Sequence, residues 1–216
     1  MTILTSIQTA QKLLSNGIVK LSPDQPFTFA SGIKSPIYCD CRAIMSLVDF
    51  RKNIAIALAH KIQAEYPDVQ VISGVATGSI AIPMLVADIL GLPLVYWRKP
   101  KGHGLDKSLE GIYEMGQKVV VVEDMVSTGG SSLTAIESLR SSGLQVLGAI
   151  VTYSHQMQQV DQNYAKANTR YVNLAGLSDI LEYAQTSGSL TADQVETIKD
   201  WKSDPAGWGV RHGFVG

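Results

Sequence analysis

The stretch Lys118–Ser132, with the sequence KVVVVEDMVSTGGSS, decides the fold class of this chain of 216 residues. Lys118–Val122 is a continuous β-branched run that predicts a buried strand, and it ends in two acidic residues, Glu123 and Asp124. Unbroken apolar strands are typical of parallel sheets that helices cover on both faces. The short loop Met125–Gly130 follows, and a helix is expected directly after it. The stretch therefore predicts a strand, a tight turn and a helix of an α/β protein.

The same alternation of short strands and amphipathic helices runs along the rest of the chain. It predicts a single α/β domain over residues 1–216, with a central, mainly parallel sheet flanked by helices. Four further strands are expected at Val69–Gly74, Leu92–Trp97, Gln145–Thr152 and Arg170–Leu174. Helices are expected at Thr5–Asn16, Ser46–Glu65, Ser79–Leu90, Ser131–Ser142 and Thr191–Trp201. Two segments do not fit the alternation, Pro26–Arg42 and Arg98–Gly111, and such segments gather at the carboxyl ends of strands, where ligands bind.

Charge and composition exclude several classes of protein. The 18 Lys and Arg residues nearly balance the 19 Asp and Glu residues, which gives a net charge of −1. Nucleic-acid-binding and membrane-surface proteins usually carry a net positive field, so neither partner is expected. The longest apolar run, Ile80–Ala87, is far shorter than the ~20 residues of a membrane span, and the N-terminus does not resemble a signal peptide. Cys39 and Cys41 lack a second pair at zinc spacing, so we expect reduced thiols in a cytoplasmic protein.

The loop after Asp124 has the properties of a phosphate-binding turn. Its Ser, Thr and Gly residues let the backbone curl so that N–H groups and a helix N-terminus point at one anion. It lacks the lysine of a Walker A loop, and no G-x-G-x-x-G follows a strand. Because carboxylates repel a phosphate, Glu123 and Asp124 must face other groups, and the vicinal hydroxyls of a ribose 5-phosphate fit. The alternative is a plain strand, turn and helix with an acidic cap.

Val119–Ser131 resembles the motif that binds PRPP (5-phosphoribosyl 1-diphosphate) in type I phosphoribosyltransferases. The resemblance implies that the two acids hold the ribose 2- and 3-hydroxyls, with Asp124 also serving catalysis, and that the loop holds the 5-phosphate. The implied PRPP-binding residues are Glu123, Asp124, Met125, Val126, Ser127, Thr128, Gly129, Gly130 and Ser131. A weaker match is the turn Gly74–Ser79, whose Thr77 and Gly78 would meet pyrophosphate. Taken alone, that turn merely opens a helix.

The basic segment Arg98–Gly104, RKPKGHG, carries three fixed positive charges and a histidine between glycines. Guanidinium and ammonium groups suit the oxygens of pyrophosphate, although a solvated surface loop explains the segment better when it is read alone. With Leu109–Gly111 after it, the pattern resembles the mobile catalytic loop of orotate phosphoribosyltransferases. That resemblance implies that residues 98–111 form a mobile lid, which often acts in the neighbouring site of a homodimer. The residues of this lid that are implied to bind pyrophosphate are Arg98, Lys99, Lys101 and His103. Of these, Lys101 and His103 would be catalytic.

The front segment Pro26–Asp40, PFTFASGIKSPIYCD, resembles the part of the same family that binds orotate, and this match favours orotate over purine bases. It implies a hood within residues 1–45 and a base held by Lys34, Tyr38, Cys39 and Ser127. Taken alone, the segment is an N-terminal β flap packed on the core, with a strand at Ile37–Cys41. The tail 204–216 matches no pattern, and lone histidines such as His155 are expected to be structural.

The resemblance as a whole implies transfer of the 5-phosphoribosyl group from PRPP to orotate, which gives orotidine 5-phosphate and pyrophosphate in pyrimidine synthesis. Mg²⁺ is the implied cofactor, held mainly by PRPP and by no direct protein ligand. Some relatives carry basic residues where this chain has Ala30, Gly78 and the pair Ser154–His155. Two alternatives stay open. One is a phosphoribosyltransferase for another base, and the other is a PRPP-sensing regulator without catalysis, which the lack of a helix-turn-helix segment disfavours.

Overall fold

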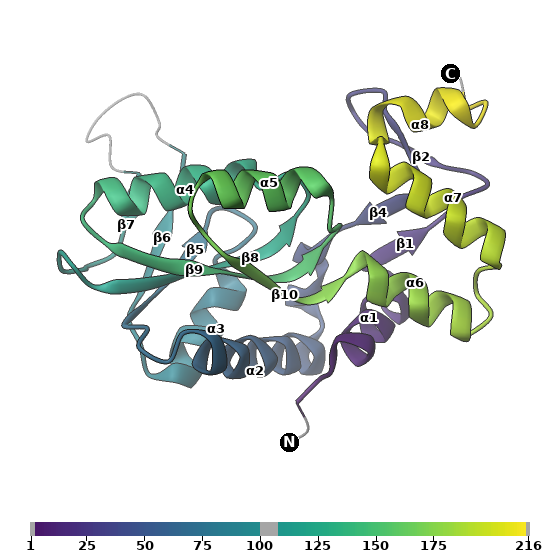
Figure 1. The fold of residues 1–216 in the computed structure, drawn as a ribbon. Coiled ribbons are helices and arrows are strands. Elements are labelled where there is room, and N and C mark those ends of the chain that lie inside the picture. Colours follow the sequence, from purple (N-terminus) through teal and green to yellow (C-terminus); the bar gives the residue numbers. More distant parts are fainter. Residues whose placement is uncertain (1–2, 100–107, 215–216) are drawn as a thin grey trace.

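The computed structural model describes residues 3–99 and 108–214, and its centre is a six-stranded sheet (Figure 1). The strands lie in the order β10–β9–β8–β5–β6–β7. Their bounds are β5 (Val71–Val75), β6 (Leu94–Trp97), β7 (Leu109–Glu110), β8 (Lys118–Val126), β9 (Gln145–Ser154) and β10 (Tyr171–Gly176). Neighbouring strands run parallel, except that β6 and β7 pair antiparallel at one edge. The expected mainly parallel sheet is confirmed.

Helices cover both faces of this sheet, as the unbroken valine run of β8 predicts (Figure 1). Successive strand residues point to opposite faces, so Val120 and Val122 join one buried cluster while Val119 and Val121 join another. The first cluster includes residues of α2 (Val48–Glu65) and α3 (Ala81–Leu90). The second includes residues of α4 (Gly130–Ser141) and α5 (Gln158–Lys166). A strand buried on both faces therefore needs no polar residue until it reaches Glu123.

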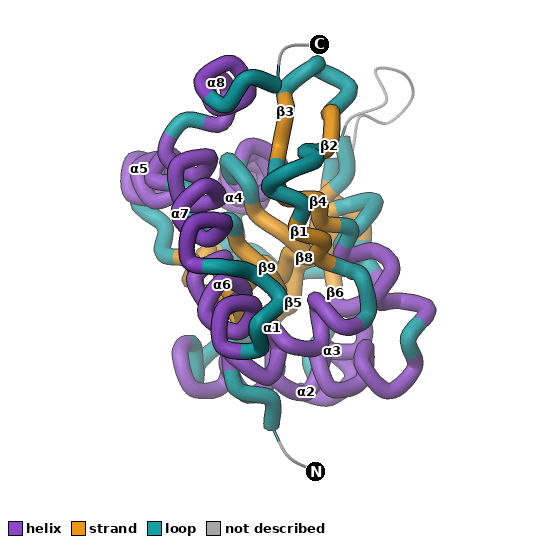
Figure 2. Tube along the Cα trace, turned by 90° about the vertical axis from the view of Figure 1, so that its right-hand side faces the viewer, coloured by secondary structure: helices purple, strands orange, loops and turns teal. Residues whose placement is uncertain are grey.

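Elements from the N-terminal and C-terminal parts of the chain lie together at one side of the central sheet (Figures 1 and 2). From the front come α1 (Ser6–Ser15), β1 (Val19–Leu21), β2 (Phe27–Thr28), β3 (Lys34–Ser35), β4 (Ile37–Cys39) and the 3-10 helix η1 (Cys41–Ser46). From the end come α6 (Leu177–Thr186), α7 (Ala192–Ser203) and α8 (Pro205–Arg211). Helix α8 covers β3 so closely that a Cβ at Gly209 would lie 2.9 Å from Lys34 Cβ. The tail thus forms a wall of the hood.

The order of the strands creates a crevice between β5 and β8. After β5 the chain passes through α3 to β6 on one side, whereas after β8 it passes through α4 to β9 on the other side. The two connections therefore leave the carboxyl ends of β5 and β8 in opposite directions, and the crevice lies between them. In open α/β sheets, ligands bind at this kind of switch point. The topology therefore brings the turn after β5 and the loop after β8 to one place.

All five strands predicted for the central sheet and all five predicted helices are present, with bounds shifted by a few residues. One boundary was wrong: β8 continues to Val126, so Glu123, Asp124 and Met125 lie within the strand. The reason is that β9 is long enough to continue the ladder, with Glu123 opposite Val151 and Val126 opposite Ser154. The short strand β4 was expected, at Ile37–Cys41, whereas the other short strands and the helices α5, α6 and α8 were not predicted. Within residues 3–99 and 108–214, no helix has the length and apolar character needed to cross a membrane.

Candidate active site

Glu123 and Asp124 lie near the carboxyl end of β8 and are largely shielded from solvent. The carboxyl of Glu123 is buried, and its Oε2 has no hydrogen-bond partner among the described residues. Burial, with Asp124 beside it, raises the pKa of Glu123 well above the usual range. Asp124 is half-buried, and its Oδ1 accepts a 2.7 Å hydrogen bond from the Met125 amide. Burial also raises the pKa of Asp124, while that bond and the Arg42 charge oppose the rise. Glu123 Oε2 therefore lacks a donor, and a hydroxyl group of a ligand would supply one.

The loop after β8 presents unpaired N–H groups. The amides of residues 127–131 donate to no acceptor within the described part of the chain. The loop is held instead through its carbonyls, since Asn163 Nδ2 donates to Thr128 O at 3.0 Å and Ser132 Oγ donates to Gly129 O at 3.1 Å. Helix α4 begins at Gly130 without a side-chain cap. A helix N-terminus with free amides is a ready site for an anion such as a phosphate.

Gly129 allows the loop to take this shape. Its φ is +83°, and a Cβ there would lie 2.9 Å from Cε2 of the buried Tyr164. Tyr164 is fixed, because its hydroxyl donates a 2.8 Å hydrogen bond to Ser132 Oγ. Both the backbone conformation and the close ring therefore require glycine at this position.

The turn after β5 lies directly against Asp124. It is closed by hydrogen bonds between the backbones of Val75 and Ser79, and Ser79 Oγ donates to Val122 O of β8 at 3.1 Å. A Cβ at Gly78 would lie 3.0 Å from Asp124 Oδ2. The structure thus brings together the two segments that were expected to bind PRPP, around one crevice.

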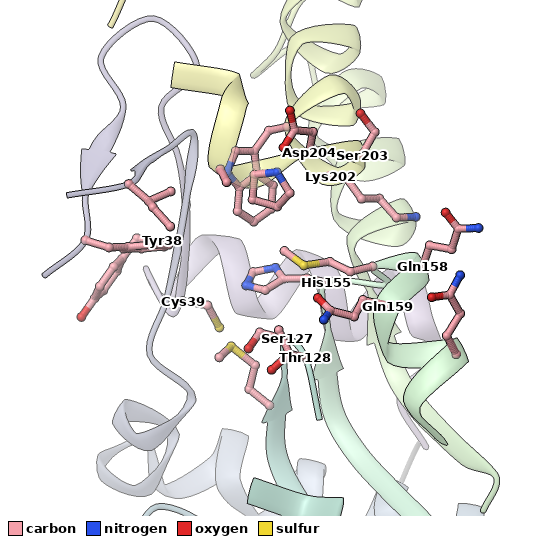
Figure 3. Close-up of a pocket in the computed structure, with 18 residues that line it drawn as sticks. Tyr38, Cys39, Ser127, Thr128, His155, Gln158, Gln159, Lys202, Ser203 and Asp204 are labelled. Carbon is pink, nitrogen blue, oxygen red and sulfur yellow. The ribbon is translucent and has the colours of Figure 1, made fainter. Parts of the chain in front are cut away.

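A cavity of about 810 Å³ opens between the hood, the loop after β8 and the C-terminal helices (Figure 3). Tyr38 and Cys39 line it from β4, and Ser127 and Thr128 line it from the loop. Its volume is within the usual range for small-molecule sites, ~300–1,000 Å³. Three residues expected to hold the base, Tyr38, Cys39 and Ser127, therefore share one cavity.

Lys34, the fourth of these residues, lies elsewhere. Its Nζ donates a 3.0 Å hydrogen bond to Thr28 Oγ1, and its stem packs against Gly209 of α8. Lys34 is not among the side chains that line the cavity. It joins the hood to the C-terminal helix in this structure, and its role toward a base stays a prediction.

The basic segment is only partly described. Arg98 donates from Nε to Glu110 Oε1 at 2.8 Å, which fixes it to the edge strand β7, and Lys99 is exposed. Lys101 and His103 lie outside the described residues. Their expected action on pyrophosphate stays a prediction.

The sequence did not predict most of the cavity lining, and His155 and Trp201 are its two aromatic residues from the C-terminal half of the chain. His155 is only 5% exposed, its Nδ1 lies 3.1 Å from the Tyr153 hydroxyl, and burial lowers its pKa to about 4. Its ring meets the edge of Trp201 with centroids 5.5 Å apart. Figure 3 shows His155 between the hood and the polar side chains at the start of α5. No spacing in the sequence signals this contact, because β9, α7 and the hood meet only in the folded chain.

The fold and the crevice have the parts of a phosphoribosyltransferase, and residues 48–175 match the family described as phosphoribosyl transferase domain. The chain is similar to the orotate phosphoribosyltransferase of Porphyromonas gingivalis W83, with 45% identity over 93% of this chain and 96% of that protein. It is also similar to that of Listeria monocytogenes F2365, with 42% identity over 94% and 97%. The solved orotate phosphoribosyltransferase of Aeropyrum pernix is 31% identical, with a TM-score of 0.68 over 84% of this chain and 99% of that one. The chain belongs to the orotate phosphoribosyltransferase family.

Proposed function

We propose that this chain transfers the 5-phosphoribosyl group from PRPP to orotate, giving orotidine 5-phosphate and pyrophosphate, as a step of pyrimidine synthesis. The observation that carries this proposal is the loop of free amides after β8, which lies beside the buried, unpaired Glu123 Oε2 and the Asp124 carboxyl at the switch point. A phosphate and the vicinal hydroxyls of one ribose satisfy both at once. The adjoining cavity has room for a flat base, and the family membership favours orotate among the bases.

The residues of this chain act mainly by holding the reactants and by placing charge. Cleavage at the ribosyl carbon builds positive charge on the sugar, as in glycoside hydrolysis. Glu123 and Asp124 would hold the hydroxyls and offset that charge. The loop after β8 would fix the phosphate end, and Tyr38, Cys39 and Ser127 would orient the base. Lys101 and His103, with Arg98 and Lys99, would stabilise the negative charge on the leaving pyrophosphate. Holding both reactants in line can contribute ~7–11 kcal/mol at best.

Mg²⁺ fits this site as an ion carried by the substrate. Among residues 3–99 and 108–214, no three His, Cys, Asp or Glu side chains are grouped to hold a metal. Mg²⁺ prefers oxygen ligands and keeps few protein contacts when phosphates are available, so the diphosphate would hold it. Bound in that way, it supplies charge stabilisation to the leaving group.

The direct test follows the loss of orotate absorbance with PRPP and Mg²⁺, and omits each component in turn. Consumption of orotate only in the complete mixture supports the proposal. Turnover of a different base in a panel would favour a phosphoribosyltransferase for that base. PRPP binding without turnover of any base would favour a sensing protein instead. A nucleic-acid-binding assay at physiological salt then tests that last alternative.

We also propose a cytoplasmic homodimer whose basic segment, residues 98–111, acts in the neighbouring site. Met84 and Ile89 of α3 are exposed by 57% and 48%. Met84 lines a groove together with Leu92, Leu94 and Tyr96. Exposed apolar patches of this kind favour association. Mixing Lys101→Ala with Asp124→Asn protein should restore part of the activity, because a mixed dimer keeps one intact site. No recovery, or a monomer by light scattering, would contradict the shared site.

A further inference from the structure

Arg42 is a cation at the crevice that the sequence analysis did not assign. It stands in the first turn of η1, and its Nε donates a 2.7 Å hydrogen bond to Asp40 Oδ1. The same carboxylate oxygen accepts from the Arg42 amide at 3.3 Å and so caps η1. Asp40 therefore fixes one edge of the guanidinium. The other two nitrogens, Nη1 and Nη2, have no acceptor among the residues that the structure describes.

Gly78 makes room for this side chain beside Asp124. A Cβ at Gly78 would lie 3.0 Å from Asp124 Oδ2 and 3.4 Å from Arg42 Cγ. Arg42 and Asp124 therefore flank the same bare turn, one from the hood and one from β8. A side chain at position 78 would displace one of them.

The charges of the two groups act on each other across this turn. Burial raises the pKa of Asp124, and its hydrogen bonds with the Met125 amide and Glu123, followed by the Arg42 charge, lower it. Asp40 and, to a lesser extent, Asp124 raise the pKa of Arg42. The other ionisable groups that act on this site are Glu123 on β8, Tyr38 on β4 and the buried Cys41 thiol on η1. None of these carries a positive charge. Among the described residues, Arg42 is the cation that acts on Asp124.

We propose that Arg42, held by Asp40, is a PRPP-positioning residue. Its charge favours the ionised form of the Asp124 carboxyl, which accepts hydrogen bonds from the ribose hydroxyls. Its two free nitrogens are donors for the oxygens of PRPP that lie over the turn at Thr77 and Gly78. This inference rests on the proposed function, because it assumes that the crevice holds PRPP.

The test compares Arg42→Gln with Arg42→Lys and with a matched control, Arg51→Gln. Arg51 lies on α2 and donates to the Met45 carbonyl, so its loss removes the same charge elsewhere. Arg42→Gln removes the positive charge of a side chain that is 63% exposed, so solvent moderates the effect of the loss on PRPP binding. We expect the KM for PRPP to rise about tenfold in Arg42→Gln, with the KM for orotate nearly unchanged.

The pH profile separates a positioning role from a structural one. Without the Arg42 charge, Asp124 takes up a proton at higher pH, so the acid limb of kcat/KM for PRPP should move to higher pH. Arg42→Lys keeps the charge, so its PRPP KM and its acid limb should lie between those of wild type and Arg42→Gln. Asp40→Asn should change both quantities in the same direction as Arg42→Gln, but less. Gly78→Ala tests the same arrangement in a second way, because its Cβ would push Arg42 and Asp124 apart. It should raise the KM for PRPP and leave the KM for orotate unchanged.

The two hypotheses fail in different ways. If the wild-type protein forms no orotidine 5-phosphate, the proposed function itself is wrong. If the wild-type protein is active but Arg42→Gln matches Arg51→Gln in the PRPP KM and in the acid limb, the role of Arg42 is overturned. Circular dichroism of each variant establishes that the compared proteins are folded.

Discussion

The replacement Gly129→Ala tests whether the loop after β8 has the shape described above. Alanine at a φ of +83° is in the left-handed region, which costs an L-residue ~1–2 kcal/mol. Its Cβ would also lie 2.9 Å from Tyr164 Cε2, and Tyr164 is buried and hydrogen-bonded to Ser132. Forcing an extra methyl into a packed site costs ~1–3 kcal/mol more. The sum is roughly 2–5 kcal/mol.

Gly188→Ala is the matched control for that sum. Gly188 has a φ of +73°, yet nothing lies within 4 Å of its Cβ position, so the substitution carries the backbone cost without the clash. For a chain of this length, 1 kcal/mol lowers Tm by roughly 2–4 °C. We therefore expect a fall of roughly 2–8 °C for Gly188→Ala and roughly 4–20 °C for Gly129→Ala.

Thermal unfolding with and without saturating PRPP measures both stability and binding. PRPP should raise the Tm of wild type and of Gly188→Ala alike, because a ligand of the native state stabilises it. It should raise the Tm of Gly129→Ala much less, since the loop amides no longer converge. Equal Tm values for the two variants, together with equal PRPP-induced shifts, would refute the described loop geometry.

Three further predictions concern the ionisable groups of the site. Asp124→Asn should weaken PRPP binding in calorimetric titration while circular dichroism shows an unchanged fold, and undiminished affinity would remove Asp124 from the site. Glu123→Gln should raise Tm while it weakens PRPP binding. Because burial raises the pKa of Glu123, its ionisation opposes folding, so the stability gain should grow as pH rises above the ordinary Glu pKa, and a constant gain would contradict this. His155 has a pKa of about 4, below its ordinary 6.5, so the unfolded chain takes up a proton first. Stability should therefore fall as pH drops from 6.5 toward 4, by at most ~1.4 kcal/mol per pH unit, and denaturant titrations of His155→Gln should lack this part of the fall.

The features that the sequence predicts best are those that depend only on the residues of one short segment. The run from Lys118 to Ser132 contains a strand, two acids, a tight turn and a helix start, all of which are local consequences of residue type. The bounds of β8 were wrong in the same segment, because its last four residues belong to the strand only through pairing with β9. Strand length depends on the partner strand, which no local pattern shows.

The hood shows the same division. Its motif in residues 26–40 allowed Tyr38 and Cys39 to be placed with Ser127, and one cavity indeed contains all three. Lys34 belongs to the same motif, yet it packs under Gly209, a residue 175 positions later in the chain. The direction of that side chain depends on α8, and the sequence of the tail gave no sign that it would fold back onto the hood.

Local chemistry thus determined the class of fold, the small-residue loop after β8 and the paired acids, because each lies within a few neighbouring residues. The tertiary structure alone decided that β5 and β8 are neighbours, that His155 and Trp201 line the cavity, and that Arg42 stands beside Asp124. These contacts join segments far apart in the chain. They depend on the order of strands in the sheet and on the burial of apolar faces, which many distant residues determine together.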